Sequence, residues 1–230
     1  MSLQTTGRPL DENGDPIDGT ALELDPGSPA ADLFRESPHA LASAPGSGMW
    51  SVLLDDQDAD RPEMVLWLEP DATVLPPHVH LTRDETFESL RGELTVTVDG
   101  DSRTLSPGEA YTVDPGVPHN FANESDDFAA FRVEPPWAKT VETQYTVSGL
   151  DHDGAFGADG EFGEPGPLHA LVTSEAISEE TRLEVAPDAL QRVLWATAGR
   201  VAKLLGHRAV REKYLADDYW RRTVEQPALS

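Results

Sequence analysis

The sequence contains no cysteine, which excludes disulfide bonds, thiolate metal sites and cysteine nucleophiles. Lysine is nearly absent, since Lys139, Lys203 and Lys213 are the only ones in the chain. Long hydrophobic runs are absent too. No stretch of about 18 uncharged apolar residues occurs, and the start "MSLQTTGRPLDENGDP" has no apolar core flanked by basic residues. We therefore expect a soluble, cytoplasmic protein that does not enter a membrane.

Positive charge is scarce in general. The 230 residues carry 17 Lys and Arg against 42 Asp and Glu, a formal net charge of -25. Such a chain repels nucleic acid, so we expect no nucleic-acid partner. It also repels itself, but this repulsion fades in molar salt, where the screening length is about 3 Å. The composition is typical of a salt-in halophile and favours a halophilic archaeal source, with an acidic mesophilic protein as the alternative.

The charge is unevenly distributed along the chain. Residues 191–230 carry eight Lys or Arg against four acids, a net charge of +4, which leaves -29 on the remainder. The C-terminal segment is therefore of opposite sign to the rest of the protein.

Changes in composition predict four segments. Residues 1–48 are rich in Asp, Gly, Pro and Ser, and we interpret them as an N-terminal extension and linker. Residues 49–135 form a strand-rich barrel. Residues 136–186 are predicted to be an irregular Gly-rich connection, within which "GAFGADGEFGEPGPL" is interpreted as a mobile surface loop. Residues 187–230 form a helical segment.

The central segment predicts a mainly β fold. Short β-branched and aromatic runs are typical of strands, and they recur as "MWSVLL", "EMVLWLE", "ETFESL", "ELTVTV", "AYTV" and "FAAFRV". In "ELTVTVDGDSRTL", Leu94, Val96 and Val98 alternate with polar residues, and Asp99-Gly100 is suited to a two-residue hairpin turn. Short strands punctuated by Gly and Pro indicate an antiparallel sandwich or barrel.

The C-terminal segment predicts two helices. In "APDALQRVLWATAGRVAKLLGHR", Pro187 lies near the expected start, Gly206 at the expected end, and apolar residues recur at helical spacing. A second helix is expected between Ala209 and Val224, with its aromatic residues in the core. We expect the positive helical segment to dock on the acidic remainder, within the chain or across a homodimer, burying Leu194, Val201 and Leu205.

The stretch "PPHVHLTRDETFESLRGEL" contains two histidines, His78 and His80, at alternate positions of an expected strand. Both imidazoles then point to the same face and can serve one metal centre. Glu85 follows five positions after His80, and Gly92 seven positions after Glu85. The alternative is an ordinary solvated strand end followed by an acidic turn.

A second stretch, "PGEAYTVDPGVPHNFAN", supplies His119. In a closed barrel it can face the first stretch, so that the three histidines and Glu85 converge in the interior. The two stretches resemble the two motifs of the cupin superfamily over residues 60–135. The first motif matches at His78, His80, Glu85 and Gly92, and the second at Gly108, Gly116, His119 and Asn123. Ala72 replaces the glycine that opens the first motif, and Asp114 replaces a proline of the second.

The resemblance implies a single-domain cupin with a type-2 barrel, a double-stranded β-helix or jelly roll. It also implies one divalent metal held by His78, His80, Glu85 and His119. Imidazole and carboxylate ligands suit Fe, Mn, Ni, Cu or Zn and leave two open positions on an octahedral ion. The alternative is a hydrogen-bonded polar cluster without a metal. Asp84 and Glu88 compete with Glu85 by position, but the spacing to Gly92 favours Glu85. The other histidines, His39, His152, His169 and His207, are interpreted as surface or capping residues.

Three functions are compatible with these residues. A metal-dependent dioxygenase would act on a small enolic, phenolic or acid substrate. A metal-assisted isomerase or lyase would use the metal as a Lewis acid. A non-catalytic module would bind a small molecule or the metal alone. The first is favoured slightly, and no residue is assigned a catalytic role beyond the ligands.

Overall fold

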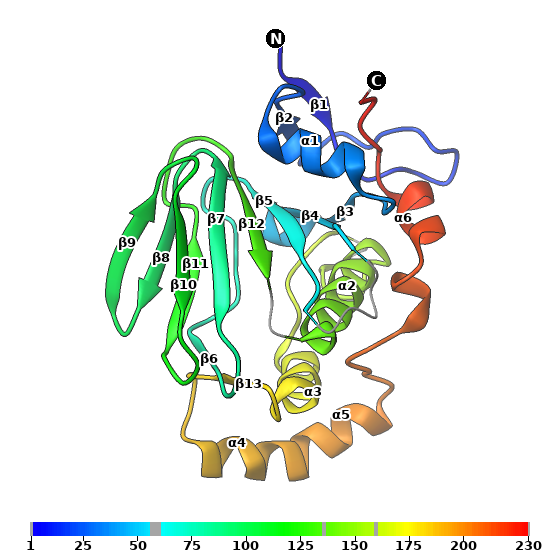
Figure 1. Cartoon of the computed structure of the whole chain (residues 1–230). Coiled ribbons are helices and arrows are strands. Elements are labelled where there is room, and N and C mark those ends of the chain that lie inside the picture. The colour runs from blue at the N-terminus through cyan, green and yellow to red at the C-terminus, as the bar shows by residue number, and fades with distance from the viewer. Residues whose placement is uncertain (1, 56–60, 135–136, 159–160, 230) are drawn as a thin grey trace.

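The β-branched and aromatic runs form strands in a computed structural model of the chain, which describes residues 2–55, 61–134, 137–158 and 161–229. Two antiparallel sheets face each other as a jelly roll, and the helices lie beside and below it (Figure 1). The larger sheet has the order β10 (Ala110–Val113), β7 (Glu85–Arg91), β12 (Ala129–Glu134), β5 (Met64–Leu68), β4 (Met49–Leu53) and β3 (Ala42–Ala44). The smaller sheet has the order β13 (Thr181–Leu183), β6 (His78–His80), β11 (His119–Ala122), β8 (Leu94–Val98) and β9 (Asp101–Leu105). The predicted mainly β jelly roll is confirmed.

Two turns show why the chain needs particular residues there. Asp99 and Gly100 join β8 to β9 with φ of 51° and 86°, and two consecutive positive φ angles match the hairpin turn that the sequence predicts. Gly92 ends β7 with φ of 67°, and a Cβ there would lie 2.4 Å from the carbonyl oxygen of Phe128. Only glycine fits this position, so its place in the first motif is structural.

The core lies between the two sheets and extends under the helices. Its largest fully buried side chains are Trp50, Trp67, Phe87, Phe131, Tyr214 and Trp220. The last two come from the C-terminal segment, where η4 (Glu212–Tyr214) and α6 (Asp217–Thr223) replace the single helix that was expected. The expectation that aromatic residues of this segment enter the core is confirmed for both.

The N-terminal segment is more regular than the predicted extension and linker. Strands β1 (Gln4–Thr6) and β2 (Leu22–Leu24) pair with each other, and helix α1 (Pro29–Glu36) begins at Ser28, whose Oγ accepts a hydrogen bond from Ala31 N. Strand β3 then extends the larger sheet. The linker interpretation is therefore wrong for these residues.

Residues 137–183 also differ from expectation. They contain helix α2 (Ala138–His152), helix α3 (Pro167–Ile177) and strand β13 instead of an irregular connection. Part of the expected mobile loop is tied down, because Asp151 accepts hydrogen bonds from Gly46 N at 2.8 Å and Gly163 N at 2.7 Å. Residues 159 and 160 of that loop lie outside the described residues.

The predicted C-terminal helix is present as one continuous rod. It consists of α4 (Asp188–Leu194), a π-helical turn labelled η3 (Trp195–Gly199) and α5 (Arg200–Leu204), and Gly206 follows with φ of 97°. The rod forms the lower edge of the molecule in Figure 1. Leu194 is half-buried, whereas Val201 and Leu205 are exposed, so these two do not dock within the chain. Docking across a homodimer, the other form of the expectation, stays a prediction.

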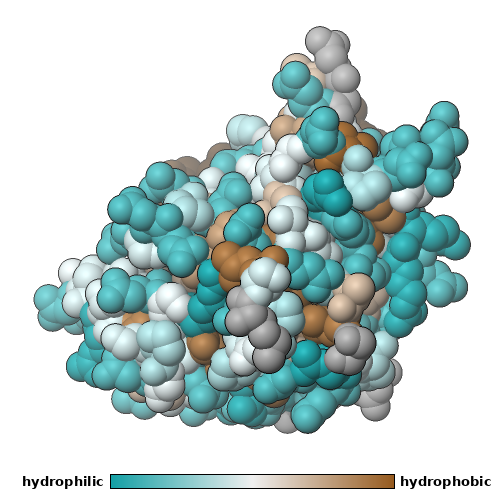
Figure 2. Space-filling model, turned by 90° about the horizontal axis from the view of Figure 1, so that it is seen from above, coloured by the Kyte–Doolittle hydropathy of each residue, from teal (hydrophilic) through white to brown (hydrophobic). Residues whose placement is uncertain are grey.

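The outer surface is dominated by polar residues. The face seen from above is largely hydrophilic, with hydrophobic residues in small separate patches (Figure 2). Among the described residues, no helix has the length and apolar character needed to cross a bilayer.

Candidate metal centre

Four buried side chains from both sheets meet inside the barrel. Strand β6 carries His78 and His80, and its neighbour β11 carries His119, which pairs in register with His78. Glu85 is the first residue of β7 in the facing sheet. The second motif was expected to face the first, but β11 lies beside β6 in the same sheet, because these two strands share hydrogen bonds. Only Glu85 comes from across the barrel.

The geometry of the cluster is compact. One ligand atom from each residue can be chosen so that all four lie within 4.8 Å of one another. The Oε2 atom of Glu85 lies 2.8 Å from Nε2 of His119, 3.2 Å from Nε2 of His80 and 3.9 Å from Nε2 of His78. The three rings form a triangle with centroid separations of 4.5 to 5.1 Å. Each residue is at most 5% exposed.

The outer nitrogen of each imidazole is held by a second contact. The Nδ1–H of His78 donates to the carbonyl of Pro76 at 3.1 Å, and that of His119 donates to the carbonyl of Val117 at 2.9 Å. Nδ1 of His80 lies 2.9 Å from the hydroxyl of Thr181. In a neutral imidazole, a proton on Nδ1 leaves a lone pair on Nε2 that can bind a cation. In a protonated imidazole, Nε2–H instead donates to Glu85.

The electrostatics of the cluster reflect this crowding. Burial raises the pKa of the Glu85 carboxyl, but hydrogen bonds from the three imidazoles outweigh burial and hold that pKa well below its usual range. Burial lowers the pKa of His80. Burial acts in the same direction on His119, but its hydrogen bond to Glu85 prevails and raises the pKa of His119. Glu85 is therefore an ionised carboxylate that requires a positive charge beside it.

The donor set fits a divalent transition metal. Three imidazole nitrogens and one carboxylate oxygen are ligands that Fe, Mn, Ni, Cu and Zn accept, and the outer hydrogen bonds hold the rings in the orientation that ligands need. A cation between the four inward atoms also removes the repulsion between their lone pairs. The cluster could therefore hold one metal ion.

The two competing carboxylates lie outside the cluster. Asp84 pairs with Arg61, with 2.8 Å between Oδ1 and Nη1. Glu88 lies 3.7 Å from Arg132, on the side of β7 that alternation turns away from the barrel interior. The structure thus brings together the four residues that the sequence singles out and neither alternative.

Aromatic side chains lie on one side of the cluster. The ring of Phe87 lies 6.2 Å from that of His119, and Phe121 and Phe131 pack against Phe87 at 5.5 and 6.2 Å. Phe87 and Phe131 are fully buried. Polar interactions at the cluster are therefore stronger than they would be in water.

Sequence reasoning missed Thr181 as a partner of this cluster. Its hydroxyl reaches His80 from β13, which pairs antiparallel with β6 in the register Thr181 to His80. Thr181 is 1% exposed and lies 101 positions after His80. No local pattern marks the contact, because it depends on a strand that closes the sheet from a distant part of the chain.

Two of the remaining histidines are not surface residues. His169 is buried in α3, with its Nδ1 atom 3.4 Å from that of His207. His152 is half-buried, with its Nε2 atom 2.9 Å from the Ser43 hydroxyl. Burial lowers the pKa of each to about 4. The surface interpretation is wrong for both because the fold packs their helices against other elements.

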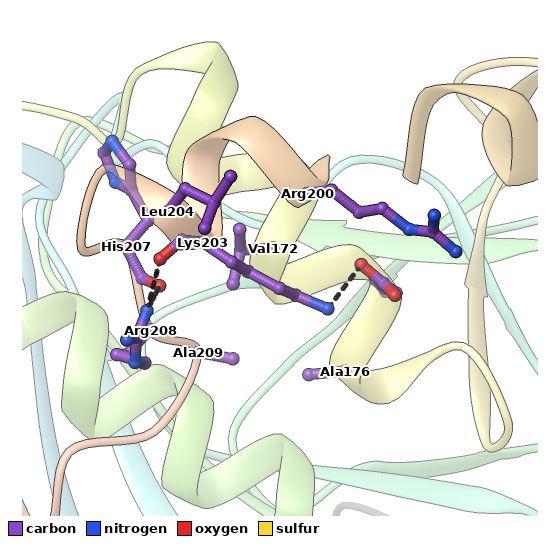
Figure 3. A pocket seen from close by; sticks show the side chains of 9 residues that line it. Val172, Ala176, Arg200, Lys203, Leu204, His207, Arg208 and Ala209 are labelled. Carbon is purple, nitrogen blue, oxygen red and sulfur yellow. Dashed lines mark hydrogen bonds and ion pairs between the residues drawn. The ribbon is translucent and has the colours of Figure 1, made fainter. Parts of the chain in front are cut away.

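A surface groove of about 660 Å³ lies elsewhere, between α3 and α5 (Figure 3). Val172, Ala176 and Leu204 are among its apolar lining, and Arg200 and Arg208 are among its charged lining. None of the four clustered residues lines it, so this groove is separate from the candidate metal centre.

Part of the chain is similar to known proteins. The sequence profile of the cupin domain family matches residues 64–133. Similar solved structures include KdgF from Halomonas sp., with 22% identity, a TM-score of 0.35, and coverage of 42% of this chain and 86% of that one. A cupin-superfamily sugar phosphate isomerase from Silicibacter pomeroyi has 25% identity, a TM-score of 0.37 and coverage of 44% and 71%. The polyketide cyclase RemF from Streptomyces resistomycificus has 24% identity and a TM-score of 0.37. The match covers 43% of this chain and 75% of that one. No curated protein gives a significant match.

Proposed function

Because residues 64–133 form a cupin domain, we propose that this chain binds one divalent transition metal and acts as a metal-dependent dioxygenase on a small enolic, phenolic or acid substrate. The proposed ligands are His78, His80, Glu85 and His119. The observation that carries the proposal is the geometry of the cluster, in which three imidazole nitrogens and a carboxylate oxygen converge in a buried interior.

The residues of the chain have separate parts in this proposal. A metal held by these four residues would supply a Lewis acid for a substrate oxygen and for dioxygen. The carbonyls of Pro76 and Val117 and the hydroxyl of Thr181 hold the imidazoles in orientation. Glu85 supplies the negative charge that lowers the net charge of the loaded site.

The aromatic surroundings support oxygen chemistry over the alternatives. Phe87, Phe121 and Phe131 keep one side of the cluster apolar. A dry apolar site admits dioxygen and protects reactive species from water.

The acidic composition supports a proposed working environment of high salt, as in the cytoplasm of a halophilic archaeon. A net charge of -25 on 230 residues destabilises a compact chain unless counter-ions screen it.

The decisive experiment measures metal content first and oxygen consumption second. Protein purified without chelating resin should contain about one transition-metal ion per chain, as measured by plasma mass spectrometry. An oxygen electrode should then record uptake with at least one enolic, phenolic or small-acid compound. Turnover without oxygen uptake would assign isomerase or lyase chemistry, and ligand binding without turnover would assign a binding module. Substoichiometric metal under every reconstitution condition would reject the metal site itself.

A further inference from the structure

One face of the C-terminal helical rod is apolar and exposed to solvent. We call this face the outer stripe, and its members are Leu190 (49% exposed), Val193 (58%), Val201 (52%), Leu204 (87%) and Leu205 (67%). Isolated exposed apolar residues are common on proteins, but a continuous row along one helix needs a partner surface. Two of its members, Val201 and Leu205, are expected to be buried within the chain or across a homodimer, and within the chain they are exposed.

The opposite side of the rod already has a partner. Gln191, Gly199 and Ala202 are buried. The indole of Trp195 donates to the hydroxyl of Ser174 in α3 at 3.0 Å, and Lys203 pairs with Glu175 at 2.8 Å. Turning the rod to bury the outer stripe within the chain would break these contacts. Its partner must therefore come from outside the protomer.

The order of residues along the rod is symmetric about Thr197. Reading outward in both directions, Val193 corresponds to Val201 and Leu190 to Leu204, while Asp188 corresponds to Gly206, two residues before Arg208. If a second rod lies antiparallel across the first, apolar residues therefore meet apolar residues, and the acidic start of one rod meets the basic end of the other. Such a pair is related by a twofold axis, which closes the assembly at two copies.

We propose that this chain forms a homodimer through the outer stripe, with the rods of the two protomers antiparallel and crossing near Thr197. This proposal is independent of the proposed dioxygenase function. Residues 191–230 carry a net charge of +4, whereas the remainder carries -29. Contact through this segment therefore brings fewer like charges of the two copies together than contact between the acidic remainders would.

The groove beside α5 supports a protein partner over a small anion. Figure 3 shows Arg200 and Arg208 extending from opposite ends of the groove, with Lys203 directed at Glu175. The cationic groups do not converge on one point, as a bound anion would require. Leu204 and Val172 instead line an apolar stretch that continues the outer stripe towards α3 and can accept side chains of a second copy.

The first test compares oligomeric mass by light scattering after size exclusion, in low salt and in molar KCl. The full chain should have twice the protomer mass. Leu204→Glu and Val193→Asp should each shift the protein to protomer mass or raise the dissociation constant at least tenfold. Ile17→Glu is the matched control, because Ile17 is also exposed (40%) but lies in the N-terminal segment, and it should stay dimeric. Circular dichroism checks that each variant is folded.

The second test uses the absence of native cysteine. Thr197→Cys places one thiol near the proposed axis, so mild oxidation should give a covalent dimer. Ser102→Cys, on exposed strand β9, should remain uncrosslinked. A folded protein that stays monomeric at all concentrations, a dimer that survives Leu204→Glu, or a dimer in which Thr197→Cys fails to crosslink would each overturn the proposal. A monomer that binds phosphatidylglycerol vesicles through Leu204 would also overturn it and would assign the outer stripe to lipid.

Discussion

At the scale of single residues, the candidate metal centre depends on the inward direction of each ligand atom. Two imidazoles are oriented by backbone carbonyls only two positions away, Pro76 for His78 and Val117 for His119. The orientation of His78 and His119 therefore depends only on residues close by in the sequence. His80 is different, because its outer nitrogen depends on a distant side chain.

Removing one imidazole should remove the metal. We expect His80→Ala and His119→Ala each to lose most bound metal, because the barrel offers no replacement ligand nearby. Glu88→Gln is the control and should keep it, since Glu88 faces Arg132 outside the cluster. Metal content per folded chain is the measurement. Undiminished metal in the double variant His80→Ala/His119→Ala would contradict the site.

Glu85 plays a separate part from the imidazoles. Glu85→Gln keeps an oxygen ligand but loses the negative charge, so we expect metal affinity to fall by about 10- to 100-fold while the barrel stays folded. Competition with a chromogenic chelator measures this affinity. Equal affinity in Glu85→Gln and wild type would exclude Glu85 as a ligand.

His152 should make the fold sensitive to acid. Burial lowers the pKa of His152 to about 4 in the folded protein, against about 6.5 in an unfolded chain, and outweighs the opposite effect of its contact with Ser43. Between these two values the unfolded chain binds the proton more tightly. The stability contribution is therefore complete above pH 6.5 and is lost as the pH falls towards 4.

The corresponding variant is His152→Gln. From pH 7 to pH 5, the wild type should lose about 2 kcal/mol more free energy of unfolding than the variant, because each unit of pKa difference corresponds to about 1.4 kcal/mol. Urea unfolding at the two pH values provides the measurement. Equal losses in both proteins would show that His152 is not the source of acid sensitivity.

At the scale of elements, the short strand β13 connects the helical segments to the metal centre. It has three residues and pairs antiparallel with β6, so that Thr181 lies opposite His80 and Leu183 opposite His78. The backbone N–H of Glu184 adds one more hydrogen bond between these segments, which it donates to the carbonyl of Pro77 at 2.7 Å. The part of the chain beyond the cupin match therefore covers the strand that carries two proposed ligands.

Thr181 provides a test of this connection. Thr181→Val keeps the shape of the side chain but removes the hydroxyl beside His80, so we expect metal affinity to fall by about 10- to 100-fold. Thr181→Ser keeps the hydroxyl and should retain most of the affinity. Imidazole nitrogen chemical shifts of His80 should change in the valine variant only. Identical affinities and shifts in the two variants would assign Thr181 a packing role alone.

At the scale of the whole molecule, charge opposes folding. The chain has a net charge of -25, because only 17 Lys and Arg oppose 42 Asp and Glu. Many of the cationic side chains already form ion pairs. The remaining carboxylates repel one another over about 10 Å in dilute salt and over about 3 Å in molar salt. Screening should therefore stabilise the native state.

Thermal unfolding should show this effect directly. We expect the melting temperature to rise by about 5 °C or more between dilute buffer and about 2 M KCl, because 1 kcal/mol corresponds to about 2–4 °C for a chain of this size. Sorbitol at the same osmolality is the control, since it does not screen charge. A midpoint that is unchanged in KCl would remove the halophile proposal.

The sequence by itself determined the strands between residues 49 and 133, the Asp99-Gly100 turn and the four clustered residues. The strands and the turn depend on neighbours within a few positions, through alternation and positive φ at glycine. Spacing on one strand gives only His78 and His80, and the resemblance to the cupin motifs supplies Glu85 and His119. Helix α2 shows the limit, because Val141 and Tyr145 pack inward among buried Thr, Ser and Gly residues that have poor helix propensity. Tertiary structure alone decided that helix, the burial of His152 and His169, the contact between Thr181 and His80, and the exposure of the outer stripe. These features depend on which distant surfaces meet, and no local pattern contains that information.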